Sequence, residues 1–196
     1  MINPTHAKAR TLQNAHSSLV IVVARHQYNK RVEDAILAFA EIKKHLPEAQ
    51  LHLFGKGPDE SKLRGLVNKL GLDAVVMFRG FLSDLSQEYA AAKLILVTSR
   101  IEGFGLALLE AVSYGIPAVS YNVRYGPSDL IDDGKSGFLT EEDPSKLAEK
   151  ALVLLQDPEM HKVFSDNAYV KSREFCEDVV FEKWDKLLKY IEETRS

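Results

Sequence analysis

The sequence predicts an α/β fold, a doubly wound parallel sheet with helices on both faces. Three observations lead to it. Short apolar runs rich in β-branched residues recur along the chain, helical patterns separate them, and glycines or polar residues follow them. Strands that alternate with helices at this spacing favour parallel pairing. A chain of 196 residues has room for one medium-sized domain of this kind.

The first predicted strand covers residues 19–24 (LVIVVA), a continuous apolar run typical of a strand that is covered on both faces. Residues 1–17 before it are polar and without a period, so we expect a tail or the remnant of a linker, and a single domain over 18–196. Similar apolar runs predict the further strands 51–54, 74–78, 94–98, 118–120 and 137–140.

Helices are predicted between these strands. Residues 32–45 carry apolar side chains at helical spacing, and Pro58 and the Asp-Pro pairs at 143 and 157 are typical of helix starts. These patterns give helices over 32–45, 58–70, 85–92, 144–156, from 158 onward, and over 179–193, with an apolar helix directly after Gly105. The stretch 121–137 is expected to be an irregular loop.

The last predicted helix places Phe181, Trp184, Leu188 and Ile191 on one face. Such a face is more often core packing than a cofactor site. It would be partly exposed if it belongs against another domain.

Composition excludes several classes of function. The formal net charge of -3 provides no basic excess for binding nucleic acid. Cys176 is the only cysteine, which excludes an internal disulfide and fits a reducing cytoplasm. Neither a signal-peptide core nor an uncharged run of membrane-spanning length occurs, so we expect a cytoplasmic protein.

Glu110 is the residue that needs an explanation. Its neighbours Ala107, Leu108, Leu109 and Ala111 are apolar nearly all the way round, which predicts a buried helix. A buried carboxylate without a partner costs several kcal/mol, roughly, and no basic residue stands three or four positions away. Another part of the fold, or a ligand with hydroxyl groups, is expected to satisfy it.

Cations gather in the turns that follow the predicted strands. Arg25 and Lys30 follow the first strand, Gly55-Lys56-Gly57 follows the second, and the stretch 100–105 follows the fourth. The carboxyl ends of parallel strands share one edge, so these turns predict a site for an anion such as diphosphate. The alternative is that each is an ordinary solvated surface charge. His26 lies beside Arg25 and could contact phosphate, but as an exposed turn histidine it is expected to have no role.

The turn after the first strand reads ARHQYNKR and lacks Gly-x-Gly-x-x-Gly, so a dehydrogenase-like dinucleotide binder is a distant third hypothesis. Neither a P-loop nor His-Glu-x-x-His occurs, and no metal site is predicted.

The strongest motif is EGFGLALLEA at 102–111, with GIPAV at 115–119 and VMFRG at 76–80 before it. The order of these motifs along the chain resembles that of the donor-binding, C-terminal half of the retaining GT-B glycosyltransferases of family 4. The characteristic motif of that family is Glu-x7-Glu. The resemblance covers about residues 19–139 and implies one Rossmann-like half of a GT-B fold. The loop YGPSDLIDDGKSGF at 125–138 is similar to that of poly(glycerol-phosphate) α-glucosyltransferases and related teichoic-acid enzymes.

The resemblance implies a role for each charged residue. Arg25 and Lys30 would hold the donor diphosphate and stabilise the leaving group. Glu102 would face the hydroxyls of the donor sugar, and Glu110 would accept hydrogen bonds from the ribose diol. Such enzymes need no metal, because the cations replace its charge.

Backbone groups would complete the donor site. Phe81 and Leu82 would contact the base through their main chain. Amides after Glu102 would meet the sugar and phosphate, namely those of Gly103, Phe104, Gly105 and Leu106. The implied donor is a nucleotide sugar, carried by UDP, with glucose or N-acetylglucosamine as the sugar.

Three departures from the family pattern concern the first turn: Ala24 where glycine is common, Asn29 where glutamate is common, and Arg31 where glycine is frequent. Length is a further departure, because a GT-B enzyme has two such halves. We therefore expect the acceptor-binding N-terminal half, and any membrane association through it, to be missing, and this chain alone to bind donor weakly and transfer nothing. The alternative is a non-catalytic partner subunit that keeps the fold as an interaction surface.

Overall fold

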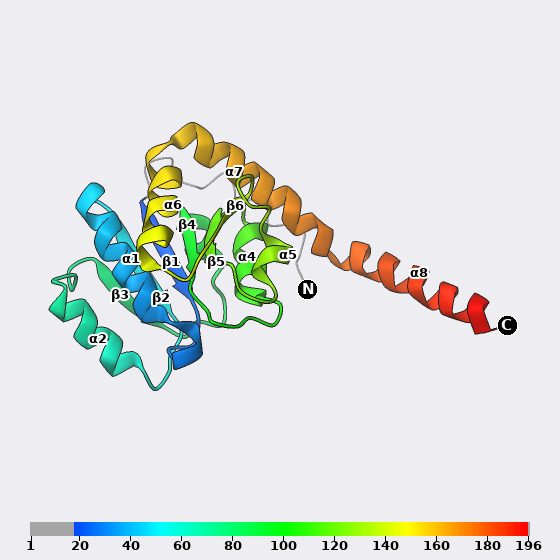
Figure 1. Cartoon of the computed structure of the whole chain (residues 1–196), viewed down its shortest axis with the longest axis horizontal. Coiled ribbons are helices and arrows are strands. Elements are labelled where there is room, and N and C mark those ends of the chain that lie inside the picture. The colour runs from blue at the N-terminus through cyan, green and yellow to red at the C-terminus, as the bar shows by residue number, and fades with distance from the viewer. Residues whose placement is uncertain (1–17, 196) are drawn as a thin grey trace.

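The structure, a computed structural model, describes residues 18–195 and gives no account of the Arg195 side chain. The tail predicted at 1–17 lies outside the described residues. The described part forms a six-stranded sheet in the order β3-β2-β1-β4-β5-β6, and every pairing in it is parallel. The predicted fold class is confirmed (Figure 1).

The strands are short and lie close to their predicted positions. They are β1 (Leu19–Val23), β2 (Gln50–Phe54), β3 (Val76–Gly80), β4 (Leu94–Val97), β5 (Ala118–Tyr121) and β6 (Gly137–Thr140). The chain moves outward from β1 to β3 and then returns to pair β4 with β1. This reversal between β1 and β4 is the position where open α/β sheets bind their ligands.

Helices cover both faces of the sheet. They are α1 (Val32–His45), α2 (Glu60–Lys69), α3 (Ser86–Ala91), α4 (Leu106–Ser113), α5 (Pro127–Leu130), α6 (Pro144–Gln156), α7 (Pro158–Ser172) and α8 (Glu177–Arg195), with single 3-10 turns at Tyr28–Lys30 and Arg173–Phe175. The stretch expected to be an irregular loop therefore contains the short helix α5, because Pro127 fixes a helical start there.

Two apolar clusters form the core, one on each face of the sheet. Side chains of β1 alternate between them, with Val20 and Val22 in one cluster and Ile21 in the other. The first cluster packs β1 and β2 against α1, α2 and α6, and the second packs β1 and β4 against α3 and α4. This explains why β1 reads as an unbroken apolar run.

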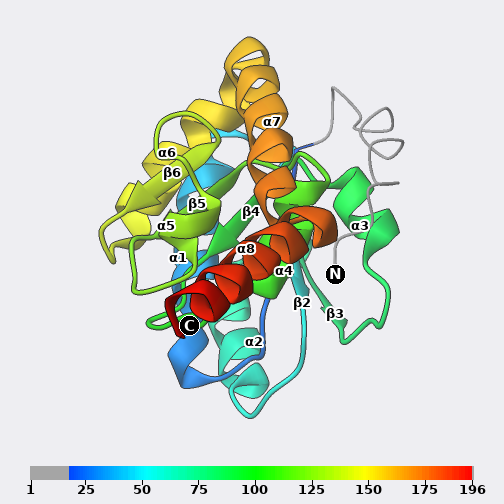
Figure 2. The ribbon, with the colours of Figure 1, turned by 90° about the vertical axis from the view of Figure 1, so that its right-hand side faces the viewer.

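The last helix, α8, leaves the body beyond α7 (Figures 1 and 2). Its Phe181, Trp184 and Leu188 side chains are more than half exposed to solvent. Core packing, the more common explanation for such a face, is therefore wrong for these residues within the described chain.

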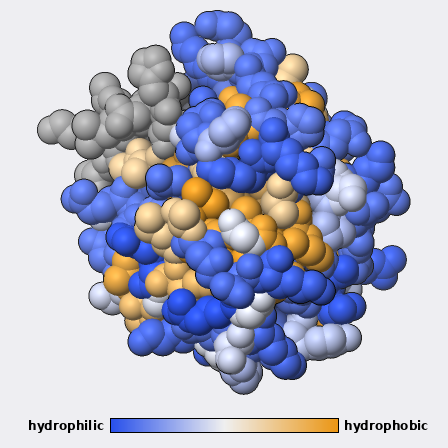
Figure 3. Space-filling model, turned by 90° about the vertical axis from the view of Figure 1, so that its left-hand side faces the viewer, coloured by the Kyte–Doolittle hydropathy of each residue, from blue (hydrophilic) through white to orange (hydrophobic). Residues whose placement is uncertain are grey.

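The side of the molecule that carries α1, α2 and β3 shows apolar surface gathered within a polar surround (Figure 3). Met77 of the edge strand β3 is among the exposed large apolar side chains. None of the helices in residues 18–195 combines the length and apolarity needed to cross a bilayer.

Candidate functional site

The loops after β1, β2 and β4 are joined to one another by backbone hydrogen bonds at the carboxyl edge of the sheet. The His26 amide donates to the Lys56 carbonyl at 3.1 Å, and the Arg100 amide donates to the Asn29 carbonyl at 2.8 Å. Thr98 Oγ1 donates to the Lys30 carbonyl at 2.9 Å. The three predicted turns therefore lie together, as the parallel sheet requires.

Two glycines allow the first two loops to approach this closely. Gly55 has φ of 123°, and a Cβ there would lie 1.9 Å from the Ala24 carbonyl oxygen. A Cβ on Gly57 would lie 2.1 Å from the His26 carbonyl oxygen. No larger residue fits either position, so these glycines allow the turn that carries Lys56 to pack directly against the loop that carries Arg25.

Lys30, Glu102 and Ser99 form a polar cluster in this rim. Lys30 Nζ lies 2.5 Å from Glu102 Oε1, and both side chains are mostly buried. Ser99 Oγ donates to the same oxygen at 2.6 Å and is only 2% exposed. The Glu102 carboxylate is thus held from two sides, next to a cavity of about 190 Å³ that both Lys30 and Glu102 line.

Arg25 is not part of that cluster. It is exposed, forms no ion pair within residues 18–195, and lines a second cavity of about 550 Å³ with Lys56, Phe81 and Leu82. The Phe81 side chain is 71% exposed. Val23 lines both cavities, so Arg25 and Lys30 flank the end of β1 from adjoining hollows.

The glycine-spaced turn lies at the start of α4. Gly105 has φ of 85°, a left-handed conformation that favours glycine, and the helix begins at the next residue. Within the described chain the backbone amides of Gly103, Phe104 and Gly105 donate to no protein acceptor. Free amides at a helix start provide hydrogen-bond donors and a partial positive charge for an anion.

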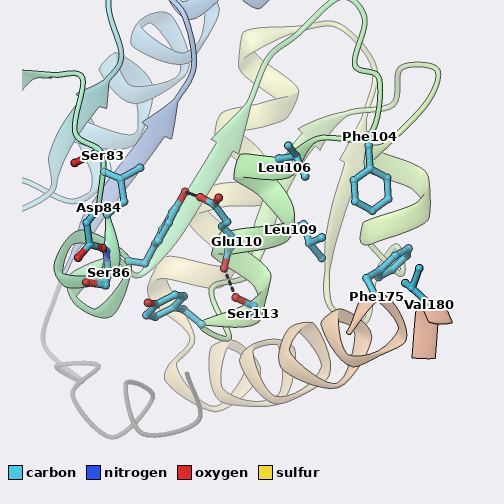
Figure 4. A pocket seen from close by; sticks show the side chains of 13 residues that line it. Ser83, Asp84, Ser86, Phe104, Leu106, Leu109, Glu110, Ser113, Phe175 and Val180 are labelled. Atoms are coloured by element: carbon cyan, nitrogen blue, oxygen red, sulfur yellow. Dashed lines mark hydrogen bonds between the residues drawn. The ribbon is translucent and has the colours of Figure 1, made fainter. Parts of the chain in front are cut away.

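Glu110 is exposed, so the prediction of a buried carboxylate is wrong. Helix α4 buries Leu108, Ala111 and Val112, while Leu106 and Glu110, four positions apart, lie on its open face. That face forms a wall of a third cavity of about 550 Å³. Figure 4 shows Glu110 between the loop carrying Ser83 and Asp84 and an apolar wall that includes Phe104. An open cavity, not an apolar core, surrounds the carboxylate.

A tyrosine that no sequence motif indicates forms a hydrogen bond with Glu110. Tyr89 Oη donates a hydrogen bond to Glu110 Oε2 at 3.0 Å. Burial first, and then the nearby carboxylate, raise the pKa of Tyr89 far above its usual range, so the phenol keeps its proton and remains a donor. Tyr89 lies 21 positions from Glu110. No local sequence pattern links them, whereas Ser99 could have been found as a polar residue directly after a strand.

His26 is buried, which contradicts the expectation of an exposed turn residue. Its ring packs edge-on against Phe78, and Nδ1 lies 3.6 Å from Glu60 Oε2. Burial lowers the pKa of His26 despite the Glu60 carboxylate. The His26 backbone amide and carbonyl also form hydrogen bonds with residues 56 and 59. Backbone and ring of His26 therefore both hold the first two loops together.

In the described residues no three side chains of the His, Cys, Asp and Glu types come together closely enough to hold a metal ion. The charged side chains that line the three cavities include the cations Arg25, Lys30 and Lys56 and the acids Asp84, Glu102 and Glu110. Cations beside unused amides can bind an anion, and carboxylates in open cavities can accept hydrogen bonds from hydroxyls.

Comparison with known proteins identifies what this arrangement resembles. The family described as glycosyl transferases group 1 matches residues 5–171. The chain is 31% identical over 176 residues to the poly(glycerol-phosphate) alpha-glucosyltransferase of Bacillus subtilis, covering 89% of this chain and 26% of that protein. It is 33% identical over 180 residues to the UDP-N-acetylglucosamine–peptide N-acetylglucosaminyltransferase GtfA subunit of Streptococcus gordonii, covering 88% of this chain and 35% of that protein.

A solved structure gives the same result in three dimensions. The pneumococcal O-GlcNAc transferase GtfA in complex with UDP and GlcNAc superposes with a TM-score of 0.82 and 26% identity, over 92% of this chain and 38% of that one. The chain thus spans between 26% and 38% of the length of these three proteins.

Proposed function

This chain belongs to the group 1 glycosyl transferases, and from that premise we propose that it binds a UDP-sugar as the donor half of a retaining hexosyltransferase of family 4. The proposed activity is α-glucosyl or α-N-acetylglucosaminyl transfer to teichoic acid or another cell-surface glycan. Transfer belongs to the longer protein, and the acceptor-binding half lies outside this chain. The isolated chain binds the donor and transfers nothing.

The observation that carries the proposal is that the cavity lined by Lys30 and Glu102 adjoins two larger cavities, one lined by Arg25 and the other by Glu110. Leu85 lines both larger cavities, and Leu106 is shared between the Glu102 cavity and the Glu110 cavity. A nucleotide sugar has three chemically different parts, the base, the ribose and the sugar, and each can be matched to one of these cavities. We assign the base to the Phe81 and Leu82 cavity, the ribose to Glu110, and the sugar to Glu102.

The diphosphate then lies among Arg25, Lys30 and the amides of Gly103 to Gly105. In the transfer the bond between the sugar C1 and the phosphate oxygen breaks, and its electron pair stays with the departing UDP. A bond from C1 to the acceptor oxygen forms, and the acceptor proton passes to a phosphate oxygen of the UDP. Negative charge grows on the departing UDP, and fixed cations and amides that contact it lower the barrier. Lys30 and Arg25 supply that charge without a metal ion.

Calorimetric titration with UDP in the presence of EDTA tests the proposal. We expect measurable binding by the wild-type chain and a loss of about tenfold or more with Lys30→Ala or Glu110→Ala, since each removes a charged hydrogen-bond partner. Lys69→Ala and Glu159→Ala remove exposed charges outside the three cavities and are the matched controls. Absence of UDP binding at millimolar concentration would overturn the proposal in favour of a non-catalytic subunit.

The sugar is tested by comparing UDP-glucose with UDP-N-acetylglucosamine in the same titration. ADP- and GDP-linked glucose serve as controls for the base. If all nucleotides bind equally, the assignment of UDP is wrong although the diphosphate site stands.

A further inference from the structure

We propose that Tyr89 is a positioning residue for Glu110 and that it sets the affinity of the site for the ribose diol of the nucleotide. This inference rests on the proposed function, because it assigns a second residue to the same ribose subsite. Tyr89 lies in α3, whereas Glu110 lies in α4, so the contact joins two elements across the cavity.

The hydrogen bond fixes one oxygen of an otherwise mobile acid. Glu110 is exposed on the open face of α4, and a glutamate in that position ordinarily samples several rotamers. Tyr89 Oη holds Oε2 at 3.0 Å, and Figure 4 shows this carboxylate bond as a dashed line at the cavity wall. Within residues 18–195, Oε1 accepts no hydrogen bond. One oxygen is thereby anchored, and the other remains available to a ligand hydroxyl.

Tyr89 can act as an anchor because its own position is fixed. Its side chain is only 2% exposed. Its ring packs against the Tyr114 ring with centroids 5.4 Å apart, and its hydroxyl also lies 3.4 Å from the Ala107 carbonyl oxygen. Ring packing and burial leave the phenol a single orientation, in which its oxygen reaches the cavity beside Glu110.

A carboxylate held in this way is ready to receive a vicinal diol. Two neighbouring hydroxyls need two acceptor oxygens in a defined plane, and Oε2 retains a second lone pair while it accepts from Tyr89. Ordering one flexible side chain before binding improves affinity by about three- to tenfold, the range associated with immobilising such a side chain. The effect exists only for ligands that carry the diol.

The test compares UDP with 2′,3′-dideoxy-UDP on the wild-type chain and on Tyr89→Phe. We expect the Kd for UDP to rise about three- to tenfold in the variant, and the Kd for dideoxy-UDP to stay at its wild-type value. In the Glu110→Ala background the Tyr89→Phe substitution should add nothing, because the group that it positions is gone.

Tyr121→Phe is the matched control. Tyr121 Oη also donates to a carboxylate, Asp34 Oδ2 at 2.9 Å, but in the cluster on the opposite face of the sheet. This variant should lower stability and leave the ratio of the two Kd values unchanged. Circular dichroism and thermal unfolding of each variant check that it is folded.

The possible failures are distinguishable. If the wild-type chain binds no UDP, the proposed function fails. If the wild-type chain binds UDP in a Glu110-dependent manner but Tyr89→Phe binds it equally well, only the role of Tyr89 is overturned. Equal weakening of UDP and dideoxy-UDP would likewise overturn it, because it would show a general packing effect.

Discussion

Lys30 Nζ lies 2.5 Å from Glu102 Oε1, so the proposed phosphate-binding cation and the proposed sugar-binding acid satisfy each other within the chain. They belong to two loops that are joined by a hydrogen bond, which the Thr98 Oγ1 hydroxyl donates to the Lys30 carbonyl. A diphosphate that binds Lys30 must therefore exchange this ion pair, and Ser99 keeps Glu102 in place while it does so. In the proposed donor site, this ion pair would link the group that binds phosphate to the group that binds the sugar.

The first prediction concerns that coupling. Glu102→Gln removes the competing carboxylate, so Lys30 becomes more available to phosphate and UDP should bind as tightly as to wild type or up to about threefold tighter. The same change weakens contacts to sugar hydroxyls. We expect the preference for UDP-sugar over UDP to fall about fivefold, the change associated with losing part of a charged hydrogen bond.

Calorimetry on both ligands measures this ratio. Glu142→Gln is a suitable control, because Glu142 pairs with the adjacent cation Arg31 and lines none of the three cavities. An unchanged ratio in Glu102→Gln would show that Glu102 does not contact the sugar.

The second prediction concerns the close approach of the first two loops. Gly55→Ala places a Cβ 1.9 Å from the Ala24 carbonyl oxygen, at a φ that side chains rarely adopt. We expect a loss of about 3 kcal/mol or more in the free energy of unfolding, from strain and from displacement of the β1 loop. Urea denaturation followed by circular dichroism measures it.

Gly65→Ala is the opposite case and serves as its control. Gly65 lies inside α2, and a Cβ there would meet nothing within 4 Å. This substitution should stabilise the chain by about 0.5–1 kcal/mol through helix propensity. If both alanine substitutions changed the free energy of unfolding equally, the close approach of Gly55 to the Ala24 carbonyl would not exist in solution.

The sequence was sufficient to predict the strands, because parallel strands buried on both faces read as unbroken apolar runs. The boundary of β3 was less accurate, since this edge strand includes the polar Arg79 and ends at Gly80, which pairs with Phe54 where the register shifts. Edge strands carry polar residues that make their limits hard to read. Residue patterns therefore predict which strands and helices form, but polar residues in an edge strand make the position of its end difficult to predict.

The position of the candidate site's residues could be predicted only for those that closely follow strands. Arg25, Lys30 and Glu102 are near strand ends, and parallel topology alone brings their loops to one edge. The apolar composition of α4 did not reveal that its Leu106 and Glu110 face opens into a cavity. The Tyr89–Glu110 contact depends on how α3 and α4 pack, which periodicity within either helix does not determine.

The third prediction concerns pH. Burial is the main cause that lowers the pKa of His26, His52 and His161 in the folded chain. A histidine in the unfolded chain has a pKa of about 6.5. As the pH falls below that value, the unfolded state therefore binds more protons than the folded state. Stability should therefore be complete above about pH 7 and should decrease as the pH falls through the folded-state values.

Urea unfolding at about pH 7.5 and 5.5 measures this difference, in a window above the range in which carboxylates titrate. His26→Gln should reduce the pH dependence because it removes one of the three groups. Equal free energies of unfolding at the two values would contradict the prediction, and an unchanged slope in His26→Gln would place the effect on the other two histidines.

The last prediction concerns α8. Trp184 is the single tryptophan of the sequence and is 58% exposed on this projecting helix. Its fluorescence should have the red-shifted emission of an indole in water, and acrylamide should quench it nearly as efficiently as free tryptophan amide. Unfolding of the sheet should then change the emission far less than it changes circular dichroism, because the Trp184 indole is in contact with water in both states.

Trp184→Phe should leave the free energy of unfolding within about 0.5 kcal/mol of wild type, as is usual for exposed positions. A blue-shifted, shielded tryptophan would instead show that the apolar face of α8 is covered in solution, and dilution of the sample would then reveal whether a second copy of the chain covers it.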